Sequence, residues 1–296
     1  MIYSHVPVML KEIISFLDPK IGGKFIDCTL GGAGYTRAIA ELVGEKGKVL
    51  GIDLDELALE NAKRLLKEKK LNNVELVRSN FKNLNEVAES VFPGELVDGI
   101  VFDLGLSSAQ LDDEARGFSF KGERALDMSF GPDNELSTEK IVNFYSLLEL
   151  TKIFREYGEE KQAYRIAKKI VETRKKKKIK TTSDLCTLIE EIIPIRAWSK
   201  IHPATKVFQA LRMETNKELE VLAEALEQAE KRLKIGGRLV VVSFHSGEDR
   251  IVKNFLRDRK GKDFNILTKK PLIPGSFEAS CNKRARSAKL RAAQKI

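Results

Sequence analysis

The chain has 296 residues, of which 42% are hydrophobic and 32% charged, and its formal net charge is +9. This apolar content suffices for a buried core and excludes a wholly disordered chain. The sequence has no apolar stretch of the roughly 18 residues that a membrane span needs, and its first residues lack the pattern of a secretory signal. Three cysteines and three histidines lie far apart, so we expect neither disulfides nor a metal site, and a cytoplasmic location.

The first hundred residues alternate between strand and helix patterns. Four short apolar runs are typical of strands buried on both faces, at residues 24–27, 48–53, 74–78 and 97–103. Helical periodicity occupies the intervals between and after them, at residues 35–42, 56–69 and 83–91. Strands and helices that alternate at this spacing predict a parallel sheet with right-handed crossovers.

The pattern changes near residue 107 and strand-like runs are absent until about residue 201. The helical spacing of this segment is clearest at Ala163, Ile166, Ala167 and Ile170. The alternating pattern then returns, with helix at 203–234, strand at 238–243, helix at 248–257 and a last strand at 264–272. We therefore predict an α/β protein with a discontinuous Rossmann-like domain, residues 1–106 and 202–296, and an inserted all-helical domain, residues 107–201.

The positive charge is concentrated in two places. Residues 174–178 read Arg-Lys-Lys-Lys-Lys, and residues 279–296 contain six basic residues and no acid. One interpretation is a solvated helix end and a frayed tail. The other is contact with the phosphates of a nucleic acid, which releases counterions and adds direct charge pairs.

Polar and aromatic residues stand where the predicted strands end. Asp27 leads into a glycine-rich loop at residues 30–34, Asp53 ends the second strand, Phe81 follows the third and Asp103 ends the fourth. Ligands of open parallel sheets bind at these carboxyl ends, near the point where the strand order reverses. Glycines let the backbone approach a ligand, a carboxylate can bind both ribose hydroxyls, and a ring can lie against adenine. The order predicts a nucleoside site.

Each of these residues also has an ordinary structural interpretation. A tight turn requires glycine in any case, Asp53 could cap the next helix, and Phe81 could be a core residue. Asp103 could be buried with a basic partner.

The loop favours S-adenosylmethionine over NAD. The dinucleotide fingerprint Gly-x-Gly-x-x-Gly has a third glycine, whereas Gly32 and Gly34 are followed by Arg37 at that position. Asp27 before the loop would repel a pyrophosphate, but it suits the ammonium group of a methionine moiety. An NAD-dependent oxidoreductase and a noncatalytic RNA-binding factor are the alternatives.

Several motifs in a fixed order carry a resemblance to one family. They are His5-Val6-Pro7-Val8, Gly31-Gly32-Ala33-Gly34, Gly51-Ile52-Asp53, Asp103-Leu104-Gly105-Leu106-Ser107-Ser108, Arg116-Gly117-Phe118-Ser119-Phe120, His202-Pro203-Ala204-Thr205, Ser243-Phe244-His245-Ser246 and Arg284-Ala285-Arg286-Ser287. The chain resembles the MraW/RsmH family, the methyltransferases that modify the exocyclic amine of a cytidine in bacterial small-subunit ribosomal RNA. The resemblance runs nearly from end to end.

The resemblance implies an S-adenosylmethionine-dependent enzyme that methylates N4 of a specific cytidine in 16S ribosomal RNA. It implies that the partner is small-subunit ribosomal RNA or the assembled small subunit, and that the insertion recognises RNA. The family's cofactor contacts would fall on Ala33, Gly34, Tyr35, Asp53, Phe81, Asp103 and Gln110. Gln110 is taken from the family alone.

A cytosine amine is a poor nucleophile because its lone pair is delocalised into the ring, so an acceptor for its N–H would assist the reaction. Asp103 and the strand end that carries His245 are the candidate catalytic acceptors. His245 could equally be a structural histidine. The sequence gives no indication of the oligomeric state.

Overall fold

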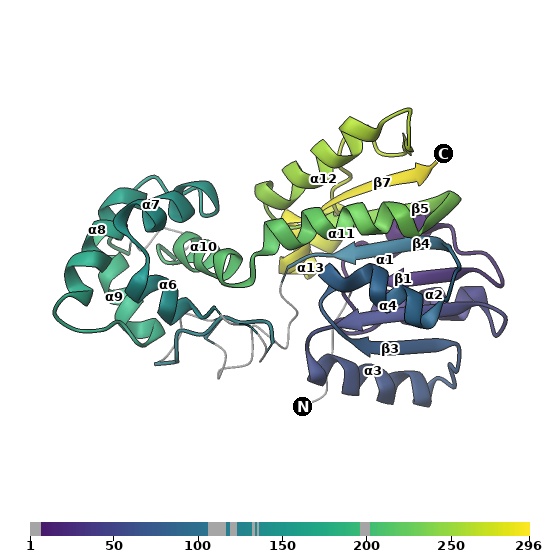
Figure 1. Ribbon diagram of the computed structural model, residues 1–296, viewed down its shortest axis with the longest axis horizontal. Helices are drawn as coiled ribbons and strands as arrows, with labels where there is room; N and C mark the ends of the chain where they lie inside the picture. Colours follow the sequence, from purple (N-terminus) through teal and green to yellow (C-terminus); the bar gives the residue numbers. More distant parts are fainter. Residues whose placement is uncertain (1–6, 106–116, 119–122, 132–133, 135, 196–201) are drawn as a thin grey trace. The chain divides into compact units, whose positions relative to one another are not determined.

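The computed structural model describes residues 7–105, 117–118, 123–131, 134, 136–195 and 202–296 (Figure 1). It divides into two compact units, residues 1–107 with 219–296, and residues 108–218. None of the described helices is long and apolar enough to cross a membrane.

Within the described residues of the first unit, seven strands form one sheet in the order β3-β2-β1-β4-β5-β7-β6. Their bounds are β1 Lys24–Asp27, β2 Lys48–Asp53, β3 Val74–Arg78, β4 Val97–Asp103, β5 Leu233–Ser243, β6 Phe264–Ile266 and β7 Lys289–Lys295. The first four strands agree with the predicted ranges, and β1 to β5 pair in parallel. The strand order reverses between β1 and β4, which places the switch point beside their carboxyl ends.

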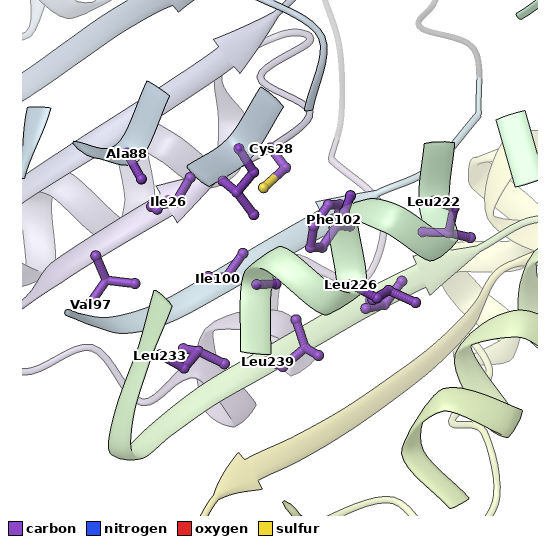
Figure 2. Packing of buried hydrophobic residues seen from close by; sticks show 14 of the residues in the cluster. Ile26, Cys28, Ala88, Val97, Ile100, Phe102, Leu222, Leu226, Leu233 and Leu239 are labelled. Atoms are coloured by element: carbon purple, nitrogen blue, oxygen red, sulfur yellow. The ribbon is translucent and has the colours of Figure 1, made fainter. Parts of the chain in front are cut away.

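Helices cover both faces of this sheet. Their bounds are α1 Leu10–Leu17, α2 Gly34–Val43, α3 Glu56–Glu68, α4 Leu84–Val91, α11 Glu218–Arg232, α12 Ser246–Arg259 and α13 Ser276–Cys281, with short 3₁₀ turns η1 Phe81–Asn83 and η2 Lys283–Ser287. Successive strand residues point to opposite faces. Ile26 and Ile100 therefore join Ala88 of α4 and Leu226 of α11 in one core (Figure 2). Neighbouring strand residues pack instead with α1 and α2 in a second core.

The end of the chain corrects one expectation. The predicted strand at 264–272 is limited to β6, and residues 289–295, expected to be part of a basic tail, form β7 between β5 and β6. β7 is antiparallel to both neighbours, and its Leu290, Ala292 and Ala293 are buried. Arg291 pairs with Asp249 of α12 at 2.7 Å. The frayed-tail interpretation is wrong for this segment.

The second unit, in its described part, consists of helices: α6 Thr138–Phe144, α7 Leu147–Glu156, α8 Ala163–Arg174, α9 Thr182–Ile192 and α10 Thr205–Asn216. The unit ends at residue 218, whereas the predicted insertion ends at 201. The difference is α10, which packs against α6 and α7. Tyr145 donates a hydrogen bond to Glu214 at 2.8 Å, and the hydroxyls of Thr138 and Thr215 are 2.8 Å apart.

Candidate functional site

The predicted residues gather at the carboxyl ends of the parallel strands. Asp27, Asp53 and Asp103 are the last residues of β1, β2 and β4, and Phe81 follows β3 as the first residue of η1. Backbone hydrogen bonds join these ends through the glycine loop. The Gly31 N–H donates to Asp53 Oδ2 at 2.8 Å, and the Asp103 N–H donates to the Thr29 hydroxyl at 2.7 Å.

The loop between β1 and α2 depends on unusual backbone conformations. Gly31 and Ala33 have φ angles of 46° and 57°, in the left-handed region. Ala33 is fully buried and precedes Gly34, the first residue of α2. A Cβ at Gly34 would lie 2.8 Å from Pro7 Cγ, so only glycine fits there without movement. The sequence thereby sets a close turn at the N-terminus of a helix, with Ala33, Gly34 and Tyr35 side by side.

Asp27 stabilises this loop through its carboxylate. Its carboxylate accepts hydrogen bonds from the Thr29 N–H at 3.2 Å and from the Thr36 hydroxyl at 2.7 Å. The side chain is fully buried, and burial raises its pKa to about 6. These contacts show that Asp27 supports the loop, and its expected proximity to a ligand's ammonium group stays a prediction.

Both carboxylate oxygens of Asp53 accept backbone hydrogen bonds at the end of β2. Oδ2 accepts from the Gly31 N–H at 2.8 Å and Oδ1 from the Asp55 N–H at 2.9 Å, and the binding of a ligand's hydroxyls stays a prediction. Burial raises the pKa of Asp53 to about 6. The alternative role as a helix cap belongs to Asp55, which accepts from the Leu57 N–H at 3.0 Å as the N-cap of α3.

Phe81 is partly buried and meets Phe102 of β4 edge to face, with ring centroids 5.7 Å apart. Phe102 is fully buried, so this contact fixes one side of the Phe81 ring against the core. These contacts support the core interpretation of Phe81, and its contact with adenine stays a prediction for the part of its surface that is exposed.

Asp103 carries the most perturbed carboxyl group of this site. Its Oδ2 accepts a hydrogen bond from the Tyr35 hydroxyl at 3.0 Å, while Oδ1 is buried and has no hydrogen-bond partner among the described residues. No Lys or Arg in the described part of the chain forms an ion pair with it. Burial, with the negative charges of Asp27 and Glu248, raises the pKa of Asp103 to about 8. An unpaired acceptor in a strand-end site marks a place for a donor or a cation.

His245 is a helix cap in this structure. It precedes α12, its Nδ1 accepts from the Glu248 N–H at 3.3 Å, and its Nε2 lies 3.1 Å from Glu248 Oε1. Glu248 is buried, and its Oε2 accepts from the Phe244 N–H at 2.8 Å and the His245 N–H at 3.3 Å. Nδ1 thus serves as the acceptor of the helix cap. The contacts support the structural interpretation of His245.

The remaining predicted residue, Gln110, lies outside the described residues. Sequence reasoning had missed Thr29, Thr36 and Glu248. Thr29 and Glu248 had a local signal, because a residue two positions after an Asp commonly donates to it and Glu is typical of the third helical position. Thr36 had no such local signal, because its partner Asp27 lies on the other side of the glycine loop in the sequence.

The charges of the site select among ligands. Asp53, Asp103 and Glu248 bring carboxyl groups to one end of the sheet, where a pyrophosphate would be repelled. A ligand with a cationic end would be favoured by these carboxyl groups, and the Oδ1 of Asp103 has no hydrogen-bond partner among the described residues.

Comparison with known proteins agrees with this chemistry. Residues 2–296 match the MraW methylase family. A relative from Caldicellulosiruptor bescii, named ribosomal RNA small subunit methyltransferase H, is 44% identical over 99% of this chain and 100% of its own. A relative of the same name from Fusobacterium nucleatum is also 44% identical, over 99% of this chain and 97% of its own.

A solved structure of a candidate rRNA-methylase from Clostridium thermocellum aligns with 99% of this chain and 100% of that chain. Its TM-score is 0.50 at 17% identity, so it supports the fold alone. The family match over the whole chain goes further than this likeness of fold. The chain belongs to the MraW methylase family and is an S-adenosylmethionine-dependent methyltransferase, as its motifs predicted.

Proposed function

We propose that this protein transfers a methyl group from S-adenosylmethionine to N4 of a specific cytidine in the 16S RNA of the small ribosomal subunit. The observation that carries the proposal is the 44% identity, over nearly the whole chain, with relatives named ribosomal RNA small subunit methyltransferase H. The choice of the cytidine amine rests on the motif resemblance and on the unpaired Asp103 oxygen at the strand ends.

The cofactor would be held by the strand-end residues predicted from the sequence. The loop at Ala33, Gly34 and Tyr35 would receive the methionine part, Asp53 the ribose hydroxyls and Phe81 the adenine. When bound, the cofactor supplies a methyl group on a positively charged sulfur. Gln110 is part of the proposed set through the family resemblance alone.

Asp103 is the proposed acceptor for the amine. A hydrogen bond from the N4 amine to Oδ1 would localise the nitrogen lone pair, and the carboxylate would then take up the proton that the amine loses. Its raised pKa favours that uptake, and a positive charge nearby would favour the ionised carboxylate needed beforehand. Asp103 would therefore both orient the amine and remove its proton.

His245 is proposed to position this strand end, not to act as the base. Its Nδ1 is engaged by the helix cap and Glu248 holds the backbone of Phe244 and His245. Protonating Nδ1 would cost the cap. The residue therefore keeps a place in the site as a support for the end of β5.

The insertion is proposed to recognise RNA. Its exposed lysines at 175–178 offer positive charge to phosphates. Arg174 is an exception within the predicted basic run, because its guanidinium donates to the carbonyls of Val142 at 2.7 Å and Tyr145 at 2.5 Å. Arg174 is therefore a structural residue.

The test is to incubate the protein and labelled S-adenosylmethionine with small subunits that lack the modification, and to map the methylated nucleotide by mass spectrometry. We expect one N4-methylcytidine in 16S RNA. Asp103→Asn should lower kcat by about a hundredfold or more, as the loss of a general base does. Asp258→Asn, which changes an exposed Asp of α12, should leave kcat unchanged. A methyl group on another atom, or full activity of Asp103→Asn, would contradict the proposal.

A further inference from the structure

An exposed aromatic ring lies beside the lysine-rich loop of the second unit. Phe144 is the last residue of α6, and 70% of its surface is exposed. The Lys178 ammonium lies 5.7 Å from the centroid of its ring, within the range of a cation–π contact. Lys175, Lys176 and Lys177 precede Lys178 in the loop after α8, and all of them are exposed. Ring and charge thus occur together on one surface.

The loop is fixed against the end of α6 at both of its ends. At its start, Arg174 donates to the carbonyls of Val142 and Tyr145, which flank Phe144. At its end, the Asn143 side chain donates to the Ile179 carbonyl at 2.7 Å and accepts from the Ile179 N–H at 3.1 Å. These four hydrogen bonds hold the lysines next to the ring before any partner binds. A surface ordered in advance loses less entropy on binding.

A hollow of about 200 Å³ adjoins the same loop. Its lining includes Lys177, Lys178, and the hydroxyl residues Thr173, Ser183 and Thr187. Ammonium and hydroxyl groups are donors that phosphate oxygens accept. Asp184 also lines the hollow. It pairs with Lys177 at 3.2 Å, and its pKa is lowered by hydrogen bonds from Lys180, Lys177 and Thr181 although burial opposes this. The negative charge of Asp184 is thus paired with Lys177. Lys178 lines the hollow and also contacts the Phe144 ring.

We propose that Phe144 and Lys178 form a subsite for one unpaired nucleotide of the RNA substrate, with the base stacked on the Phe144 ring and its phosphate at the hollow. The inference rests on the proposed function, since it takes RNA as the substrate. Proteins grip single strands by this combination of aromatic stacking and a positive groove. A nucleotide can use both features at once, because its base stacks on the ring while its phosphate pairs with the ammonium groups, so RNA is the occupant that we propose.

The test measures the affinity of the full-length protein for a short fluorescent single-stranded RNA, and for the same RNA in a duplex. Phe144→Leu should weaken single-strand binding roughly fivefold or more, because a stacked base is lost. It should leave the salt dependence and the duplex affinity unchanged. Phe144→Trp should restore affinity, and its fluorescence should be quenched by the stacked base, with the wild-type signal of the single native tryptophan subtracted.

Two further variants separate stacking from charge and from surface loss. Lys178→Gln should lower the slope of log affinity against log salt by about one. The control is Tyr164→Leu, because Tyr164 is 51% exposed on the same unit. It lies ten residues before the end of α8, about 15 Å along the helix, and should leave affinity unchanged.

Unchanged single-strand affinity of a folded Phe144→Leu variant, shown by an unaltered melting temperature, would overturn the inference. A second contrary result would be that Phe144→Leu weakens the binding of polyglutamate, measured in parallel, without changing the affinity for RNA. The surface would then bind an acidic protein segment. If the wild-type enzyme methylates small subunits while Phe144→Leu keeps its RNA affinity, only the subsite is wrong. If the wild type fails to methylate them, the proposed function is wrong, and the RNA measurements still decide the subsite.

Discussion

The Tyr35 hydroxyl has one proton but faces two acceptors. The Val8 carbonyl lies at 2.6 Å and Asp103 Oδ2 at 3.0 Å. Burial raises the pKa of Tyr35 well above its usual range and that of Asp103 to about 8, and the charges of Asp27 and Glu248 act in the same direction on Asp103. One hydroxyl proton therefore serves two acceptors, and the hydrogen bond from Tyr35 stabilises the ionised form of Asp103 less than burial destabilises it.

Asp103 should make stability depend on pH. Its pKa is raised in the folded protein, so its stabilising contribution is complete below about pH 4 and is lost as the pH rises through about 8. Asp103→Asn cannot ionise, and melting temperatures recorded between about pH 5 and pH 9 should fall less steeply for this variant. At the upper end it should melt a few degrees above wild type. Asp258→Asn is the control, and parallel curves for Asp103→Asn and wild type would contradict the assignment.

Sequence reasoning predicted the strand-end acids well because their positions follow from the period of the buried runs. It could not choose between the roles of His245, since a helix cap and a general base both place a histidine at the end of a strand. It also did not predict the contact between Thr36 and Asp27, because the pattern shows only that an acid ends a strand.

At the scale of elements, β7 depends on a buried ion pair. Arg291 Nε and one guanidinium nitrogen contact the two oxygens of Asp249, at 2.7 and 3.2 Å. Their side chains are 10% and 14% exposed. A charge left alone in such surroundings is costly. The sequence did not predict β7, because alanine and lysine are poor strand formers and the density of basic residues indicated a surface tail.

Arg291→Leu should therefore lower the free energy of unfolding by roughly 3 kcal/mol, because Asp249 then retains only the more distant Lys289, at 3.9 Å. The double variant with Asp249→Leu should recover much of this loss, since neither charge then remains buried. Urea denaturation of the single and double variants gives both values. Arg250→Leu, at an exposed position of α12, should change little. Equal losses for Arg250→Leu and Arg291→Leu would show that β7 does not depend on the pair.

At the scale of the whole molecule, the net charge is +9, and the clustered basic residues that contribute to it fall into two groups. The basic residues of β7 pair within the first unit, where Arg291 contacts Asp249 and Lys295 contacts Glu230. The lysines at 175–178 are exposed on the second unit. A sequence gives the number of charges and their clustering, but ion pairs between distant residues depend on the fold. For this reason the sequence predicted the exposure of the lysines at 175–178 but not the ion pairs of the basic residues in β7.

Replacing Lys175, Lys176 and Lys178 with Gln should reduce the salt dependence of RNA binding by about one unit of slope for each phosphate that no longer meets a lysine. Affinity for S-adenosylmethionine should not change, because its proposed residues other than Gln110 lie in the first unit and none of them belongs to the lysine loop. Titrations at several salt concentrations measure both. The matched control removes three exposed lysines from the region of α3, Lys63, Lys67 and Lys70. An equal decrease of slope in the control would assign the effect to net charge alone.

The order of the last strands constrains how the nascent chain can fold. β6 is synthesised before β7, yet in the sheet β7 separates it from β5. β6 therefore has no neighbouring strand until β7 has been synthesised, and it joins the sheet only through its pairing with β7. Amide hydrogens in β6 and β7 should consequently exchange together, and sooner than those of the central strands.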